Sequence, residues 1–251
     1  IIEVEGKNLF ANYWLVDVDG IGTLEAYPNR NSLDYVDLYN LKDVKTMYRG
    51  TFRNISHCDT WFTLSQMGFY KEDEIFENLT GTVKEFILTK MFKLNKGECL
   101  KTFLIEKFNL SKNGIILKKF EWLGFFDDSK IPIKKGGAID VLTAIMLEKM
   151  SYEKGERDLL VLHHKFVAKY PNKTQKITST MIDYGIPNGD SSMARTVSLP
   201  AAIAVRIILE NKINLTGVYM PTLPEIYEPV LAELENLNIK GLDMFRYAQA
   251  E

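Results

Sequence analysis

The spacing of apolar residues changes twice along the sequence. Over residues 1–30, apolar residues alternate with polar ones, as in LFANYWLVDV, which is typical of β-strands with one buried face. From about 58 to 152, apolar residues recur at three- and four-residue steps, which is typical of helices in series. Strand-like stretches then return. We therefore expect an α+β fold, with a mixed sheet and flanking helices in 1–57 and 128–251 and a small all-helical domain inserted at 58–127.

The clearest pair of strands surrounds a turn cluster at 171–174, Pro-Asn-Lys-Thr. DLLVLHHKFVAKY precedes this turn and KITSTMIDYGI follows it. Two strand-like runs joined by such a turn predict a β-hairpin. A further strand is predicted over 44–54, VKTMYRGTFRN.

Helix starts are predicted from residues that can cap them. The candidates are Ser32 before LDYVDLYNL, Thr82–Glu85 before FILTKMFKL, Ser198 as the cap of the second piece of a helix that Pro200 breaks, and Thr222–Glu225 before PEIYEPVLAELENL.

Composition excludes some partners. The net charge of −2 over 251 residues gives no reason to expect binding to nucleic acid or to an anionic membrane. No run of 18 apolar residues is present, so we expect no transmembrane helix. Cys58 and Cys99 lie far apart and outside any CxxC pattern, which favours reduced thiols in a cytoplasmic protein and no metal site.

The common catalytic and nucleotide-binding motifs are absent from this stretch. DGIGTLEA has only two of the three glycines of a dinucleotide-binding fingerprint, and the phosphate-loop, HExxH and GxSxG patterns do not occur. His163 and His164 are adjacent in a predicted strand, so their side chains point to opposite faces and cannot share a metal. No residue can be assigned as a general acid or base.

Three arginines form the most specific pattern. Arg30 lies in the turn YPNRNS, while Arg49, Thr51 and Arg53 fall on one face of the following strand. A guanidinium matches a carboxylate with two parallel hydrogen bonds, so converging arginines indicate a ligand with several carboxylates. Solvated arginines, or arginines paired with nearby acids such as Asp34, are the alternative.

The segment SSMARTVSLP, 191–200, brings small and hydroxyl residues to a helix start after a glycine turn. Such helix starts can bind anions, and Arg195 and Thr196 are the candidates here for a contact with a cofactor. Close helix packing explains the small residues equally well.

Six segments in order resemble the saccharopine dehydrogenase family. They are YPNRNSLDYVDLY, MYRGTFR, EKMSYEKGERDLLVLHHKF, YGIPNG, SSMARTVSLPAAIA and PEIYEPVLAEL. The match is to the C-terminal portion, which binds saccharopine and forms the dimer, together with a helical domain; it also occurs in the bifunctional aminoadipic semialdehyde synthases. The family's YPNRDS arginine falls on Arg30, and its RGTLR stretch falls on Arg49, Gly50, Thr51, Phe52 and Arg53. Asn31, Phe52, Arg195 and Ser198 depart from the residues common in the family.

The resemblance implies oxidation of saccharopine, a substrate with three carboxylates, to glutamate and 2-aminoadipate 6-semialdehyde. NAD or NADP would be bound by a Rossmann domain that this chain lacks, and this chain alone would be inactive. A homodimer is implied as well. The chain starts at Ile1 without Met, so we expect any targeting segment to lie upstream, and mitochondrial localisation stays open beside the cytoplasm.

Two other functions stay open. A carboxynorspermidine-type dehydrogenase would use the same fold on a substrate with fewer carboxylates. A module without catalysis, which only binds an amino acid or dimerises, would explain the absence of a dinucleotide-binding motif.

Overall fold

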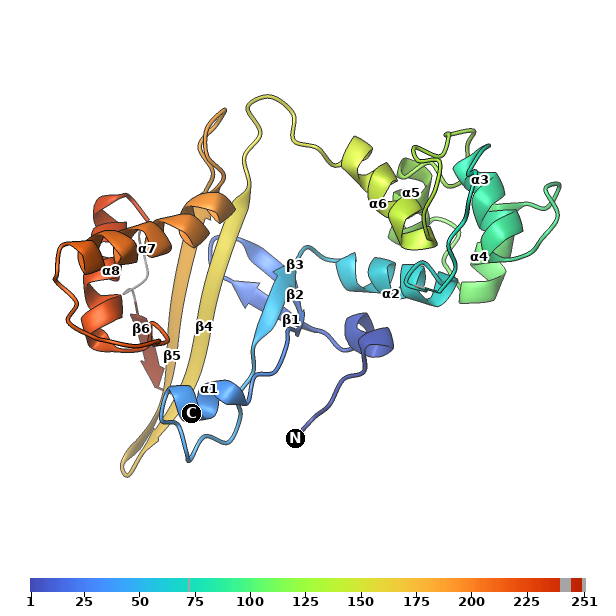
Figure 1. Cartoon of the computed structure of the whole chain (residues 1–251). Helices are drawn as coiled ribbons and strands as arrows, with labels where there is room; N and C mark the ends of the chain where they lie inside the picture. The colour runs from blue at the N-terminus through green and yellow to red at the C-terminus, as the bar shows by residue number, and fades with distance from the viewer. Residues whose placement is uncertain (72, 240–244, 250–251) are drawn as a thin grey trace. The chain divides into compact units, whose positions relative to one another are not determined.

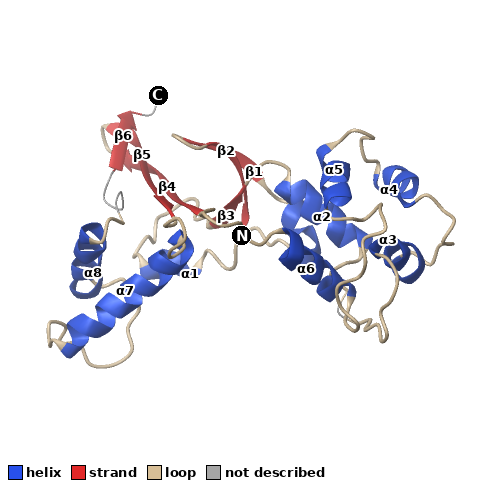
Figure 2. Ribbon diagram, turned by 90° about the horizontal axis from the view of Figure 1, so that it is seen from above, coloured by secondary structure: helices blue, strands red, loops and turns tan. Residues whose placement is uncertain are grey.

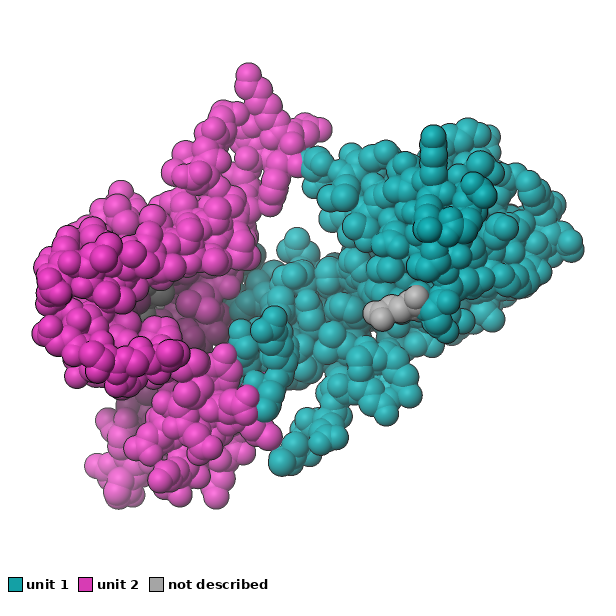
Figure 3. Space-filling model, viewed as in Figure 1, with its two compact units in different colours: residues 1–31, 48–151 teal, residues 32–47, 152–251 magenta. Residues whose placement is uncertain are grey.

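The computed structural model describes residues 1–71, 73–239 and 245–249. The chain divides into two compact units, drawn in two colours in Figure 3. Unit 1 contains Ile1–Asn31 and Tyr48–Ser151, and unit 2 contains Ser32–Met47 and Tyr152–Glu251. These boundaries differ from the predicted insertion at 58–127. The helical part extends further because helix α6 (Ala138–Lys149) contributes buried residues to the same core as the preceding helices.

Unit 1 begins with a short 3-10 helix, η1 (Gly6–Ala11), and a three-stranded antiparallel sheet. Its strands are β1 (Trp14–Val18), β2 (Gly22–Pro28) and β3 (Gly50–Arg53), in that order across the sheet. The predicted strand over 44–54 is therefore much shorter than expected. Only four residues pair with β2, and Arg49 precedes the strand.

The rest of unit 1 is helical, as the periodicity predicted, and is labelled in Figure 1. Its elements are α2 (His57–Met67), α3 (Val83–Glu85), a π-helical turn η2 (Phe86–Met91), α4 (Leu100–Phe108), α5 (Ile115–Trp122) and α6. Their apolar faces meet in one core that includes the fully buried rings of Phe69, Phe120 and Phe125. The predicted capping box at Thr82–Glu85 is confirmed, with both reciprocal hydrogen bonds present.

Unit 2 is built on the predicted hairpin. Strands β4 (Leu159–Tyr170) and β5 (Lys173–Tyr184) pair along their whole length, and β6 (Phe245–Gln249) pairs with β5. Helices α7 (Ser192–Leu209) and α8 (Pro224–Asn236) lie on the same side of this sheet (Figure 2). Met181 of β5 packs with Ile203, Ile207, Val230 and Leu234 of these helices in a second core.

The expected mixture of helices and strands is present, but the expected mixed sheet is not. Within the described ranges, every strand pairing in both sheets is antiparallel. The chain connects β1 to β2 and β4 to β5 through short turns, which only antiparallel pairing permits.

Three predicted helix starts are wrong. Helix α1 (Asp34–Leu38) is preceded by Leu33 as its cap position, not by Ser32, and α8 is preceded by Leu223, not by Thr222. Helix α7 runs without a break through Pro200, and Ser198 lies inside it, donating to the carbonyl of Ala194. A proline removes only one backbone donor, and the apolar face of α7 packs on α8 on both sides of it.

Helix α7 also meets the length and composition of a membrane-spanning helix. Its 18 residues have a mean hydropathy of 1.4, and 17% of them are buried. This segment contains no unbroken apolar run, because polar residues such as Arg195 and Arg206 interrupt it.

Candidate functional site

One face of the β2–β3 pair gathers polar and charged side chains. The register sets Glu25 opposite Arg53 and Tyr27 opposite Thr51. Directly opposed residues of an antiparallel pair project to the same side of the sheet. Glu25, Tyr27, Thr51 and Arg53 therefore share one face, as the alternation in the sequence predicted for Thr51 and Arg53.

The turn after β2 is fastened to the start of β3 by a single residue. The backbone N–H of Asn29 donates to the carbonyl of Arg49 at 3.1 Å, and its side-chain Nδ2 donates to Oγ1 of Thr51 at 2.9 Å. Arg30 follows directly, exposed and in the left-handed region with φ of 57°. Asn29 thus ties the turn that carries Arg30 to the backbone of Arg49 and to Thr51.

The alternative, in which nearby acids neutralise these arginines, can be tested for two of them. Among the residues that the structure describes, neither Arg30 nor Arg53 forms an ion pair with a carboxylate. Nη1 of Arg53 donates to the carbonyl of Phe52 at 2.7 Å and leaves the other guanidinium donors without a protein acceptor in that part of the chain. These two positive charges are available to a ligand.

Phe52, which was predicted to contact the substrate, lies on the opposite face of β3. It faces Ala26 across the strand pair, so the structure does not bring its ring together with Thr51 and Arg53. Gly50 belongs to the same face as Phe52. A Cβ at Gly50 would overlap the Tyr48 ring and lie 2.8 Å from the carbonyl oxygen of Tyr27, so only glycine fits there.

Glu25 was not singled out from the sequence, yet it organises the site. Its side chain is 1% exposed. Oε1 accepts the backbone N–H of Ser56 at 2.6 Å and Oε2 accepts that of Cys58 at 2.7 Å, so the carboxylate caps the start of α2. An acidic residue inside the apolar strand TLEAYP was the available signal, because a buried carboxylate requires partners.

The connection from β3 to α2 is held from a second side by helix α5. Nζ of Lys119 donates to the carbonyl of Ser56 at 3.0 Å. Ser56 itself has φ of 68°, a conformation that side chains rarely adopt, and it is buried. Burial lowers the pKa of Lys119 and, near Glu25, raises the pKa of the Cys58 thiol to about 12. Cys58 is therefore a protonated, buried thiol at neutral pH.

His57 begins helix α2 beside this charged face. Its ring stacks at 6.2 Å from that of Tyr27, and the rings of Phe10 and Trp61 lie within 6 Å of it. Burial, together with the positive charges of Arg53 and Lys119, lowers the pKa of His57 to about 4. The imidazole is thus neutral at pH 7, and the positive charge of this face comes from arginine and lysine.

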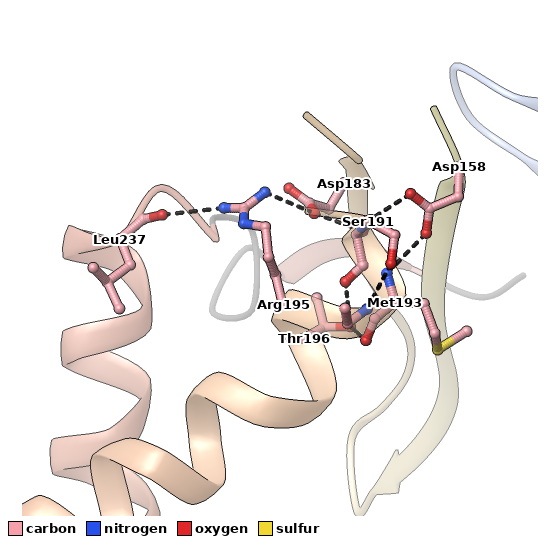
Figure 4. Close-up of polar contacts among 9 residues, drawn as sticks. Asp158, Asp183, Ser191, Met193, Arg195, Thr196 and Leu237 are labelled. Carbon is pink, nitrogen blue, oxygen red and sulfur yellow. Dashed lines mark hydrogen bonds and ion pairs between the residues drawn. The ribbon is translucent and has the colours of Figure 1, made fainter. Parts of the chain in front are cut away.

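The second candidate, the helix start at 191–200, is occupied by the protein itself. The carboxylate of Asp158 accepts the backbone N–H groups of Ser192 and Met193 at 2.7 and 2.8 Å, and Ser191 caps Ala194 (Figure 4). An external anion would therefore be repelled by the carboxylate of Asp158, which already occupies this helix start.

The two cofactor candidates in this segment also have partners within unit 2. Arg195 pairs with Asp183 at 3.4 Å and donates to the carbonyl of Leu237 at 3.3 Å, as Figure 4 shows. Thr196 donates to the carbonyl of Ser192 within its own helix at 2.9 Å. These contacts fasten α7 to β5 and to the end of α8.

No group of three or more His, Cys, Asp or Glu side chains suited to a metal occurs among the described residues. His163 contacts Thr180 across the hairpin at 2.8 Å.

Comparison with known proteins places the chain in context. Residues 1–239 match the family model of the saccharopine dehydrogenase C-terminal domain. The chain is 37% identical over 232 residues to saccharopine dehydrogenase (NADP+, L-glutamate-forming) of Saccharomyces cerevisiae, covering 84% of this chain and 48% of that protein. It is 32% identical over 263 residues to alpha-aminoadipic semialdehyde synthase of Arabidopsis thaliana, covering 97% of this chain and 25% of that protein.

A solved structure agrees with the same relationship. The apo saccharopine dehydrogenase (L-Glu forming) from Saccharomyces cerevisiae has a TM-score of 0.82 to this chain at 32% identity, covering 97% of this chain and 55% of that one. The chain thus spans about half the length of the saccharopine dehydrogenases that it matches.

Proposed function

The chain belongs to the saccharopine dehydrogenase C-terminal domain family, and we propose that it is the part of such an enzyme that binds saccharopine. The full enzyme would oxidise saccharopine with NAD or NADP to glutamate and 2-aminoadipate 6-semialdehyde, a step of lysine metabolism. In this proposal Arg30, Arg49 and Arg53 receive carboxylates of the substrate, and Thr51 donates a further hydrogen bond.

One observation supports the proposal most strongly. Arg53 lies opposite a carboxylate, that of Glu25, and yet the carboxylate binds the start of α2. With Arg30 equally without a carboxylate partner in the described residues, two guanidinium groups close to one strand pair are left for an external anion. Guanidinium groups bind carboxylates through paired, charge-assisted hydrogen bonds, and a ligand with three carboxylates suits several of them.

The start of helix α7 does not suit the pyrophosphate of a dinucleotide. The helix start of α7, where a pyrophosphate would be expected, is filled by Asp158, and Arg195 is engaged by Asp183. We therefore assign NAD or NADP to a Rossmann domain outside this sequence. Hydride transfer requires the nicotinamide against the substrate carbon, so this chain by itself would bind the substrate without oxidising it.

Calorimetric titrations of the chain with saccharopine and with NADPH test this proposal. We expect binding of saccharopine and no binding of NADPH. Strong NADPH binding would contradict the assignment of the cofactor to another domain, and the absence of saccharopine binding would contradict the function itself.

Two further observations separate the alternatives: a titration with a carboxynorspermidine-type substrate and the coding sequence upstream of Ile1. A carboxynorspermidine-type substrate has fewer carboxylates, so a chain of that type would bind it more tightly than saccharopine. A module without catalysis would lack any upstream strand followed by GxGxxG in its coding sequence. Arg30 and Arg53, which form no ion pair with a carboxylate among the described residues, support a substrate with several carboxylates over the carboxynorspermidine-type one.

We propose a homodimer as well, in the cytoplasm or in mitochondria, without contact to membrane or nucleic acid. Leu162, Phe166 and Tyr170 lie on the face that Met181 of β5 also shares, and they remain 40%, 47% and 47% exposed, which supports association through the part of this face that α7 and α8 leave open. Helix α7 buries Ile203 and Ile207 in the core that it shares with α8 and β5, which supports a role within unit 2 and not in a bilayer. Sedimentation of the purified chain would test the dimer.

A further inference from the structure

The side chain of Asn29 fixes the hydrogen-bonding role of the Thr51 hydroxyl. Nδ2 of Asn29 donates to Oγ1 of Thr51 at 2.9 Å, so this hydroxyl oxygen acts as an acceptor towards Asn29. A hydroxyl that accepts still carries one hydrogen to donate. Among the described residues no acceptor takes that hydrogen, and Thr51 is only half-buried.

The direction of this hydrogen bond decides what Thr51 offers to a ligand. We propose that Asn29 is a positioning residue, which holds the hydroxyl of Thr51 as a hydrogen-bond donor to a substrate carboxylate. The inference rests on the proposed binding of saccharopine. It adds to it a role for a residue that need not touch the substrate.

Asn29 contacts the neighbouring strand through both its backbone and its side chain. Its backbone N–H binds the carbonyl of Arg49 at 3.1 Å and its side-chain amide binds Thr51, so one residue ties the Arg30 turn to the strand at two points. Aspartate has the same shape but can only accept. It would take the hydrogen of Thr51 and turn the hydroxyl oxygen, together with a new negative charge, towards the incoming carboxylate.

The register explains why this matters for binding. Thr51 lies opposite Tyr27, and Arg53 lies on the same face two residues further along β3. A carboxylate held by the guanidinium of Arg53 on this face therefore has the Thr51 hydroxyl as a neighbouring donor. If the Thr51 hydroxyl instead donated its hydrogen to residue 29, only its oxygen would face the substrate carboxylate, and two acceptors would meet without a hydrogen between them.

The test is a calorimetric titration of the chain with saccharopine for wild type, T51V, N29A, N29D and the double variant N29A/T51V. N113A, at an exposed asparagine, is the matched control. We expect T51V and N29A each to weaken binding about tenfold, and the double variant to be no weaker than about tenfold, because both changes remove the same donor. N29D should bind saccharopine at least about tenfold more weakly than N29A does.

A purely structural role for Asn29 gives different results. N29A would then lower the melting temperature, and its effect on binding would multiply with that of T51V to about a hundredfold in the double variant. That outcome, or binding by N29D equal to that by N29A, would overturn the inference. Wild-type protein that does not bind saccharopine would instead refute the proposed function on which the inference depends.

Discussion

Glu25 and Arg53 lie opposite each other in the β2–β3 pair, but the carboxylate of Glu25 binds the backbone of Ser56 and Cys58 and not the guanidinium of Arg53. A buried carboxylate needs partners, and two N–H groups at a helix start supply them together with the helix dipole. Arg53 therefore keeps its charge for a ligand while its acidic neighbour is satisfied within the fold.

Removal of the Glu25 carboxylate should destabilise unit 1. E25A loses two charge-assisted hydrogen bonds at a buried helix start, and we expect the free energy of unfolding to fall by about 3 kcal/mol. The exposed Glu3 offers a control, and E3A should change the value by less than about 0.5 kcal/mol. Equal urea midpoints for the two variants would show that the cap contributes nothing.

Because His57 is neutral in the folded chain, we expect the free energy of unfolding to fall in acid. Its pKa is lowered to about 4 in the folded chain from the ordinary histidine value of about 6.5, so the unfolded chain binds the proton more readily between these values. Stability should therefore fall as the pH drops from about 6.5 to 4, by about 1–2 kcal/mol after allowance for solvent screening. Replacement of His57 by Phe, which suits the aromatic neighbours, should remove this part of the pH dependence in urea unfolding. Parallel pH profiles for H57F and wild type would contradict the prediction.

Gly50 should tolerate no side chain. In G50A the new Cβ would lie 2.8 Å from the carbonyl oxygen of Tyr27 and overlap Tyr48, so we expect a loss of about 1–3 kcal/mol and weaker saccharopine binding. Gly97 has no atom within 4 Å of such a Cβ, so G97A is the matched control and should be neutral. Thermal unfolding of both variants checks this, and equal melting temperatures would refute the predicted overlap.

Asp158 should stabilise unit 2 through the start of α7. D158A removes the acceptor for the N–H groups of Ser192 and Met193, and we expect a loss of about 1–2 kcal/mol. Asp190 is exposed in the turn between β5 and α7, and D190A should change stability much less. Chemical unfolding of both variants measures the difference; a D190A loss as large as that of D158A would argue against the cap.

Local chemistry made part of this structure predictable. The turn cluster at 171–174 marks the β4–β5 hairpin, and the spacing of Thr82 and Glu85 marks a helix start, because each signal acts over a few residues. The alternation of MYRGTFR likewise places Thr51 and Arg53 on one face, while it also places Phe52 on the other.

Such local signals cannot predict contacts between residues that lie far apart in the sequence. Glu25 binds residues 56 and 58, and Asp158 binds residues 192 and 193, so neither partner can be read from its neighbours in the sequence. For the same reason the α7 segment looked open to an anion, and Pro200 looked like a helix end, although packing against α8 continues across it.

The central claim is that Arg30 and Arg53, which form no ion pair with a carboxylate in the described part of the chain, bind a ligand with several carboxylates. Calorimetric titration of saccharopine into wild type, R30A and R53A tests it most directly, with the exposed Arg157 of unit 2 replaced by Ala as the control. Each loss of a charge-assisted bidentate contact should weaken binding by roughly 10- to 150-fold, while R157A binds like wild type. Binding that is unchanged in R30A and R53A would contradict the account.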